Sequence, residues 1–238
     1  MDSLLRDLDR ERSKMQTDIA NLNRHYDQLH SYVQQYLQQG IIEWARLVLD
    51  HPQAQILVLE TTTIINEDGY ATGDGHSEPL RLTTLSLASD EIWDQLLHPT
   101  FSQSITGREY HGLSMADLVG CPRIADAWPQ ICERLADRHV VIFGADWSRR
   151  ALQTVQPAPR LLDKAFCLHN KCREYYGEFY ELSLEKILAY QDINKKREQL
   201  KDSQERLLVL AQVLTNLAAG MPKHEEEPEL DDLDEHPF

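Results

Sequence analysis

The first 39 residues carry apolar side chains in two sets of positions that alternate at spacings of four and three residues. The first set is Met1, Leu8, Met15, Leu22, Leu29 and Tyr36, and the second set is Leu5, Arg12, Ile19, Tyr26 and Val33. Only Arg12 interrupts this repeat, which is typical of a helix that pairs with a second helix along one seam. Residues 1–39 are therefore predicted to form a coiled-coil helix and a homodimer. The alternative is an amphipathic helix that folds back on its own domain.

The repeat is interrupted at Gln39-Gly40. The apolar positions that follow, which include Trp44 and Leu47, predict a second and shorter helix. The sequence Asp50-His51-Pro52 is expected to end it, because proline disfavours a helical conformation in the preceding residue. Residues 40–54 are therefore assigned to a connecting helix.

The segment from 55 to 220 is expected to form one α/β domain. Apolar runs or alternating apolar and polar residues predict strands over residues 56–63, 80–87, 91–97 and 139–143. Helical periodicity predicts helices over residues 125–135, 148–155, 180–189 and 198–219. Neighbouring strands followed by strand–helix units are typical of a mixed sheet covered by helices.

Acidic residues outnumber basic ones by 39 to 24, which gives a formal net charge of −15. Eight acids lie in residues 224–238, which contain no Lys or Arg, so residues 221–238 are predicted to form a disordered acidic tail. Removing these eight charges leaves residues 1–223 at about −7. Because nucleic-acid affinity depends largely on Lys and Arg contacts to phosphates, only weak binding of single-stranded nucleic acid is expected.

The N-terminus opens with alternating charges, and no apolar run approaches the roughly 20 residues that span a bilayer, so a cytoplasmic protein is expected. In that compartment the four cysteines are expected to be reduced. Cys167, His169 and Cys172 could supply three zinc ligands. However, no fourth ligand follows at a zinc-like spacing, which disfavours zinc.

Three segments, in this order, resemble motifs of the DnaQ-like (DEDD-type) 3′–5′ exonuclease superfamily. Residues 58–63, Val-Leu-Glu-Thr-Thr-Thr, are similar to its first motif, Asp-x-Glu-Thr-Thr-Gly. Residues 110–114, Tyr-His-Gly-Leu-Ser, resemble its Ile-His-Gly-Ile-Thr segment, and residues 141–152 resemble its second motif. The resemblance implies a ribonuclease H-like α/β fold, here preceded by the long N-terminal coiled-coil helix.

The resemblance also implies a site for two metal ions, which in this family four carboxylates hold while a His or Tyr activates the attacking water. Glu60 and Asp202 align with two of these carboxylates and are its expected remnants. Val58 and Ser148 align with the other two, and Arg197 aligns with the general base. Three losses in one site indicate a degenerate nuclease, so no cofactor is expected.

Other carboxylates could restore the site. Asp146 lies two residues before Ser148, and the loop after the first strand contributes Glu67, Asp68 and Asp74. If they do, the protein is a 3′–5′ exonuclease that hydrolyses phosphodiester bonds with Mg²⁺ or Mn²⁺. The third alternative is a protein-interaction module unrelated to nucleic acid. We expect a catalytically degenerate binding or scaffolding component of nucleic-acid metabolism.

The C-terminal tip resembles that of bacterial single-stranded-DNA-binding protein, which ends in acids followed by Pro-Phe. The residues that carry the resemblance are Asp231, Asp232, Asp234, Pro237 and Phe238. In such a tip the terminal ring fills an apolar pocket while the acids contact a basic rim. The expected partner is a protein that recognises such tips.

Overall fold

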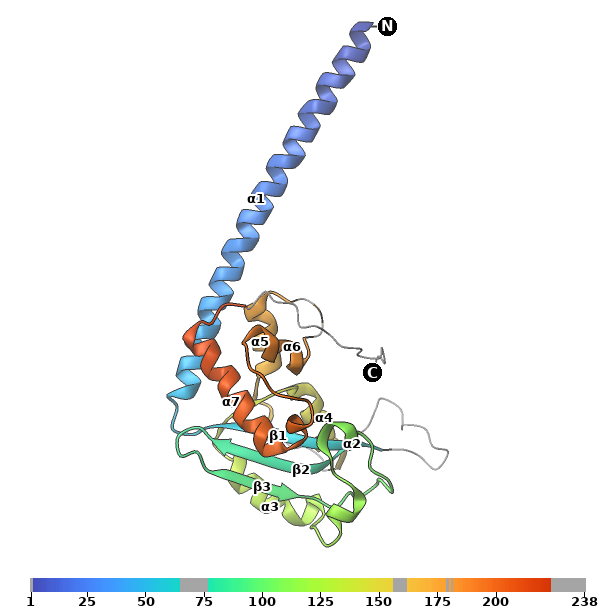
Figure 1. Ribbon diagram of the computed structural model, residues 1–238, viewed down its shortest axis with the longest axis vertical. Coiled ribbons are helices and arrows are strands. Elements are labelled where there is room, and N and C mark those ends of the chain that lie inside the picture. The colour runs from blue at the N-terminus through green and yellow to red at the C-terminus, as the bar shows by residue number, and fades with distance from the viewer. Residues whose placement is uncertain (1, 65–76, 156–161, 179, 181, 224–238) are drawn as a thin grey trace.

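A computed structural model describes residues 2–64, 77–155, 162–178, 180 and 182–223, with the side chains of residues 2–10 and 154–155 left out of the description (Figure 1). An α/β body occupies one end, and α1 (Asp2–Leu49) extends from it as a long rod. The predicted α/β class and the long N-terminal helix are confirmed.

The helix α1 continues through Gly40, so the predicted break at Gln39-Gly40 is wrong. Glycine in a helix interior costs only about 1 kcal/mol relative to alanine. Contacts on both sides of Gly40 hold the helix to the body. Gln38 donates a hydrogen bond to the carbonyl oxygen of Tyr175 at 2.9 Å, and the Ile41 side chain is buried in the core.

The body is built on a five-stranded mixed sheet in the order β3-β2-β1-β4-β5. The central strands β1 (Ala54–Thr63) and β2 (Ser77–Ser86) are antiparallel, and β3 (Ile92–Leu96) is antiparallel to β2. On the other side of β1, β4 (His139–Ile142) and β5 (Phe166–Cys167) run parallel to it. Four of these strands match the predicted ones, and β5 is too short to produce a periodic pattern.

Helices cover both faces of this sheet (Figure 1). The remaining helical elements are α2 (Arg108–His111), η2 (Met115–Leu118), α3 (Ile124–Leu135), α4 (Ala145–Val155), α5 (Leu168–Tyr176), α6 (Leu184–Tyr190), η4 (Gln199–Lys201) and α7 (Ser203–Ala219). Three predicted boundaries change, and α5 was not predicted. α4 begins three residues before Ser148, and α6 begins at Leu184 instead of residue 180, because Ser183 caps its N-terminus. The single helix expected over 198–219 divides at Asp202, which caps the N-terminus of α7.

Successive side chains of β1 point to opposite faces of the sheet and enter two separate cores. Ile56 and Val58 pack on one face with α5, α6, α7 and the last turns of α1. Leu57 and Leu59 pack on the other face with α3 and α4. This alternation places Glu60 on the same face as Val58, under α7. No helix among the described residues is long and apolar enough to cross a membrane.

Candidate functional site

The site forms where β1 passes beneath the N-terminus of α7. The pairing of β1 with β2 shifts by one residue between Glu60 and Thr61, opposite Pro79. Such irregularities bend a strand and often redirect a side chain beside a functional site, and proline is tolerated there because it donates no hydrogen bond to the ladder. Glu60 therefore lies at the last regular position of β1 before the bend.

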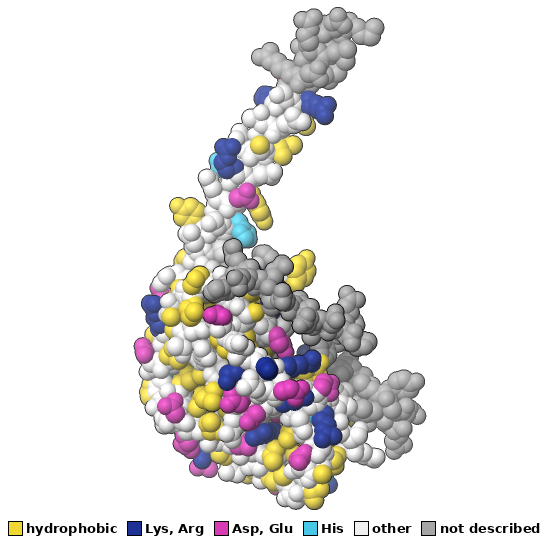
Figure 2. Space-filling view, viewed as in Figure 1, with side chains coloured by type: hydrophobic (Ala, Val, Ile, Leu, Met, Phe, Trp, Pro, Cys, Tyr) yellow, Lys and Arg dark blue, Asp and Glu magenta, His cyan; other side chains and the backbone are white. Residues whose placement is uncertain are grey.

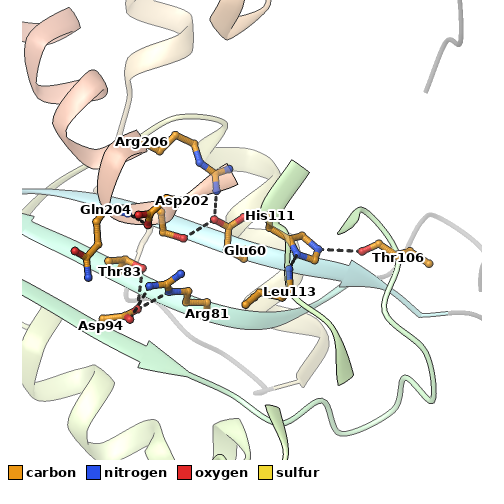
Figure 3. A network of polar contacts seen from close by, with 11 residues as sticks. Glu60, Arg81, Thr83, Asp94, Thr106, His111, Leu113, Asp202, Gln204 and Arg206 are labelled. Atoms are coloured by element: carbon orange, nitrogen blue, oxygen red, sulfur yellow. Dashed lines mark hydrogen bonds and ion pairs between the residues drawn. The ribbon is translucent and has the colours of Figure 1, made fainter. Parts of the chain in front are cut away.

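Glu60 is a buried carboxylate whose charge is compensated by α7 (Figure 3). Its side chain is only 4% exposed, and its Oε1 accepts hydrogen bonds from Arg206 Nη2 and, at 2.7 Å, from Ser203 Oγ. The Arg206 side chain is 17% exposed. A buried carboxylate requires such partners, because taking an unpaired charge out of water is strongly unfavourable.

A second ion pair lies beside the first on β2 and β3 (Figure 3). Arg81 donates to both carboxylate oxygens of Asp94, at 2.7 Å each, and Thr83 Oγ1 donates to Asp94 at 3.0 Å. The hydrogen bond to Asp94 is the main reason that the pKa of Arg81 is raised, and the negative charges of Asp202 and Glu60 add to the effect. The acids around β1 are thus interleaved with guanidinium groups.

The structure brings Glu60 and the Asp202–Ser203 segment together, as the resemblance implied, but not Asp146. The Asp202 carboxylate accepts a hydrogen bond from the Gln204 backbone N–H at 3.0 Å and so caps α7. Asp146 is exposed in the first turn of α4 and pairs with Arg149 at 2.6 Å. It therefore does not take the place of a missing carboxylate in this arrangement.

The three positions expected to be degenerate carry other interactions. Val58 packs in the core beneath α7. The Ser148 hydroxyl is buried and donates to the carbonyl oxygen of Gly144, one turn earlier in its own chain. The Arg197 guanidinium lies over the ring of Tyr110, 5.1 Å from its centroid.

These residues do not fit a pair of divalent ions. Hard cations such as Mg²⁺ require several oxygen ligands, mostly carboxylates. Of the two retained carboxylates, Glu60 is bonded to Arg206 and Ser203 and Asp202 caps a helix. Within the described residues, no group of three or more His, Cys, Asp or Glu could hold a metal ion. The predicted loop acids Glu67, Asp68 and Asp74 lie outside the described residues.

A pocket of about 400 Å³ opens on the outer side of Glu60. Two partly exposed aromatic rings line it, Trp147 at 43% and Tyr110 at 41% exposure. The Trp147 indole donates to the Thr61 hydroxyl at 3.1 Å, which fixes the ring beside β1. An arginine guanidinium lies near each ring: that of Arg150 is 5.7 Å from the centroid of Trp147, and that of Arg197 is 5.1 Å from the centroid of Tyr110.

His111, from the segment that resembles the Ile-His-Gly-Ile-Thr motif, holds the pocket wall together. Its ring is buried and bonds to the Thr106 carbonyl oxygen at 3.0 Å, while Nδ1 accepts from the Leu113 N–H at 3.1 Å. Nδ1 is an acceptor here, so Nε2 carries the proton and donates to Thr106. Thr106 in turn bonds to Thr62 and to the Thr63 N–H, which ties this loop to the end of β1.

The zinc candidates lie on a different part of the sheet. Cys167 ends β5, and His169 and Cys172 lie in α5. Cys172 is fully buried, and burial raises the pKa of its thiol. His169 packs its ring against Phe143, with the centroids 5.1 Å apart.

Sequence reasoning missed Arg206 and Ser203 as partners of Glu60. An ion pair between Arg206 and Asp202, four residues earlier, was available from the sequence, but Arg206 pairs with Glu60. Helical periodicity could have found them, because Ser203 and Arg206 lie on the same side of α7 as the buried Leu207 and Leu210. The expected docking residues Asp231, Asp232, Asp234, Pro237 and Phe238 lie outside the described residues.

Comparison with known proteins gives a fold but no sequence family. No protein-family model and no curated protein sequence matches the chain. Among solved structures, a 3′-exonuclease that recognises the 3′ end of the histone mRNA stem-loop is 10% identical, with a TM-score of 0.56. Cell-death related nuclease 4 is 14% identical and a full-length 3′-exonuclease is 12% identical, each with a TM-score of 0.51.

These matches cover most of the chain but not the whole of its neighbours. The aligned region is 72%, 72% and 71% of this chain, and 65%, 66% and 83% of the three neighbours in the same order. At such low identity the likeness shows the fold alone. The chain has the ribonuclease H-like fold of 3′-exonucleases, as the motif resemblance predicted.

Proposed function

We propose that this chain, which has the fold of 3′-exonucleases, binds single-stranded nucleic acid without cleaving it. It acts as a binding or scaffolding component of nucleic-acid metabolism.

The observation that carries the proposal is the ion pair between Glu60 and Arg206. Glu60 is the carboxylate of the first motif that remains, and the Arg206 guanidinium bonds to an oxygen atom that would coordinate a metal ion. Two divalent ions placed a few Å apart need the negative charge of several carboxylates, and this chain has Val58 and Ser148 at two of those positions. Metal-dependent hydrolysis therefore lacks its ligands, while the protein chain provides its own cation.

The pocket beside Glu60 supports the binding part. Proteins that bind single strands without sequence preference stack the bases on aromatic side chains and attract the backbone with positive charge. Trp147 and Tyr110 present partly exposed rings, and Arg150 and Arg197 lie beside them. Because arginines accompany the rings, the pocket can bind a base and a phosphate even though the whole chain is acidic.

The two ends of the chain are proposed to bind partners. Residues 1–39 pair with a second copy to form a homodimer, and the acidic tail docks on a protein that recognises the tips of single-stranded-DNA-binding proteins. Deleting residues 1–39 is expected to convert a dimer to a monomer in light scattering, and a truncated protein that still has the mass of two truncated chains would refute the pairing. Deleting Pro237 and Phe238 is expected to abolish binding to that protein. If binding survives the deletion, the two terminal residues are not the docking site, and the tail contributes only its negative charge.

Binding is tested by fluorescence anisotropy with labelled single strands and duplexes, in EDTA and in Mg²⁺. Trp147→Ala is expected to weaken single-strand binding about 5- to 150-fold, which corresponds to 1–3 kcal/mol of base stacking. Tyr180→Ala is the matched control, because this ring is exposed but does not line the pocket. Absence of binding to every oligonucleotide at low salt would favour an interaction module unrelated to nucleic acid.

Cleavage is tested with end-labelled DNA and RNA in Mg²⁺ and in Mn²⁺. The expected result is no trimming from the 3′ end. Trimming that disappears in Glu60→Ala would refute the non-cleaving proposal and establish an exonuclease with rearranged ligands. Trimming that persists in Glu60→Ala would indicate a contaminating nuclease, and the assay would then be repeated on repurified protein.

A further inference from the structure

Exposed apolar side chains occur at intervals along the rod that α1 forms outside the body (Figure 2), and their alternating spacing of four and three residues places them in one apolar stripe. The large side chains of the stripe are between 54% and 81% exposed. They are Met15, Ile19, Leu22, Tyr26, Leu29, Val33 and Tyr36. Every described side chain from 11 to 33 is exposed, and the first buried residue of α1 is Ile41. Large apolar stripes of this kind mark interaction surfaces.

We propose that the stripe is covered by α1 of a second copy of this chain, running antiparallel, with the two-fold axis between Ile19 and Leu22. The inference rests on the self-association in the proposed function and adds the orientation and the register. Residue 15 of each helix then lies opposite residue 26 of the other. Two features of α1 favour this arrangement, namely its seam residues and its flanking polar residues, and the body leaves the seam accessible.

The seam residues favour the antiparallel orientation because of Arg12. In a parallel helix pair in register, each seam residue meets its own copy, so Arg12 would face the partner's Arg12 at the centre of the seam. Like charges held together in an interface are strongly unfavourable. In the antiparallel pair each residue of the first set meets one of the second set, and Arg12 meets the partner's Leu29. Its long stem can pack there while the guanidinium reaches water.

The charges that flank the seam point the same way. In the antiparallel register Asp18 lies opposite the partner's His25, and the two-fold axis repeats this pair. In the parallel register His25 would instead lie beside the partner's His30, and Asp18 would meet no basic residue. Flanking charges of this kind set the partner and the orientation of coiled coils.

The body leaves the seam open. Every described side chain from 11 to 33 is exposed, and Gln34 and Gln38, on either side of the seam residue Tyr36, hydrogen-bond to the carbonyl oxygen of Tyr175. A Cβ added at Gly40 would meet no atom within 4 Å, so the surface of α1 there is open. A groove of about 420 Å³ between α1 and α5 adjoins the stripe at this end, and Val33 and Leu37 line it.

Disulfide trapping tests the orientation. In the proposed register Tyr26 faces the partner's Met15, so the double variant Met15→Cys/Tyr26→Cys is expected to form disulfides between residues 15 and 26 of the two chains. The single variant Tyr26→Cys is expected to form none, because two copies of residue 26 would lie about 16 Å apart along the axis, beyond the reach of a disulfide. Peptide mapping by mass spectrometry separates these products from disulfides of the native cysteines.

The antiparallel orientation and the self-association through α1 fail in different ways. Disulfides between two copies of residue 26, in a protein that light scattering shows to be a dimer, would overturn the antiparallel orientation alone. A monomer would overturn the self-association together with the orientation. Thr17→Cys, on the side of α1 opposite the seam, is the control and should form no disulfide in either orientation. Oligonucleotide binding by the same variants reports separately on the pocket.

Discussion

Replacing Arg206 by Met is expected to destabilise the α/β domain substantially. The substitution keeps most of the side-chain length but removes the charge, so the carboxylate of Glu60, 4% exposed, loses its counter-charge. Removing one partner of a buried ion pair typically costs about 3–5 kcal/mol. Ser203 still donates to Glu60, so the lower end of that range is expected. For a domain of this size, 3–5 kcal/mol lowers the melting temperature by about 6–20 °C.

Two further variants make this prediction specific. Arg134→Met breaks an ion pair with Glu91 whose side chains are 44% and 60% exposed, and exposed pairs contribute only about 0–1 kcal/mol. The double variant Glu60→Leu/Arg206→Met is expected to recover most of the loss, because apolar side chains of similar volume often replace a buried pair without cost. Urea unfolding followed by circular dichroism measures all three. If Arg206→Met costs no more than Arg134→Met, Arg206 is not the counter-charge of Glu60.

Two other predictions concern titratable groups. The pKa of Glu178 is lowered mainly by the hydrogen bond that Tyr190 donates to it and, to a smaller extent, by the charge of Lys223. The ionised carboxylate therefore stabilises the fold at pH values above the ordinary carboxyl pKa of about 4.3, and this stabilisation is lost as the pH falls through the lowered pKa. Glu178→Gln should therefore be less stable than wild type in urea at neutral pH, with a gap that closes in acid; a gap that is constant with pH would contradict this. Burial raises the pKa of Cys172, so iodoacetamide should alkylate it far more slowly than Cys121 in mass spectrometry, and equal rates would show that the core around α5 opens readily.

Much of the fold could be predicted because the sheet is buried on both faces and its strands are strongly apolar. Ile56, Val58, Leu57 and Leu59 enter two different cores, and this gives β1 a continuous apolar run. The start of α4 was harder to predict. Gly144, which adopts a positive φ of 77°, precedes it and indicates a turn, yet the helix begins at the next residue.

The candidate site could be predicted only in part. The positions of Val58 and Glu60 follow from the period of two in a strand, which needs no tertiary information. Helical periodicity places Arg206 on the buried side of α7, but it does not identify Glu60, 146 positions away in the sequence, as its partner. Asp202, four residues before Arg206, is a local alternative, but its carboxylate caps α7 by accepting from the Gln204 N–H, and Arg206 pairs with Glu60 on the face of the sheet beneath α7.

The unbroken course of α1 has a mechanical consequence. Because α1 is one continuous helix, the direction in which the apolar stripe faces is fixed relative to Ile41, which is buried in the body. Inserting one residue next to Gly40 would turn the outer segment by about 100° and advance it by about 1.5 Å. The number of residues between stripe and body therefore determines the torsional angle at which any partner on α1 is presented to the pocket beside Glu60.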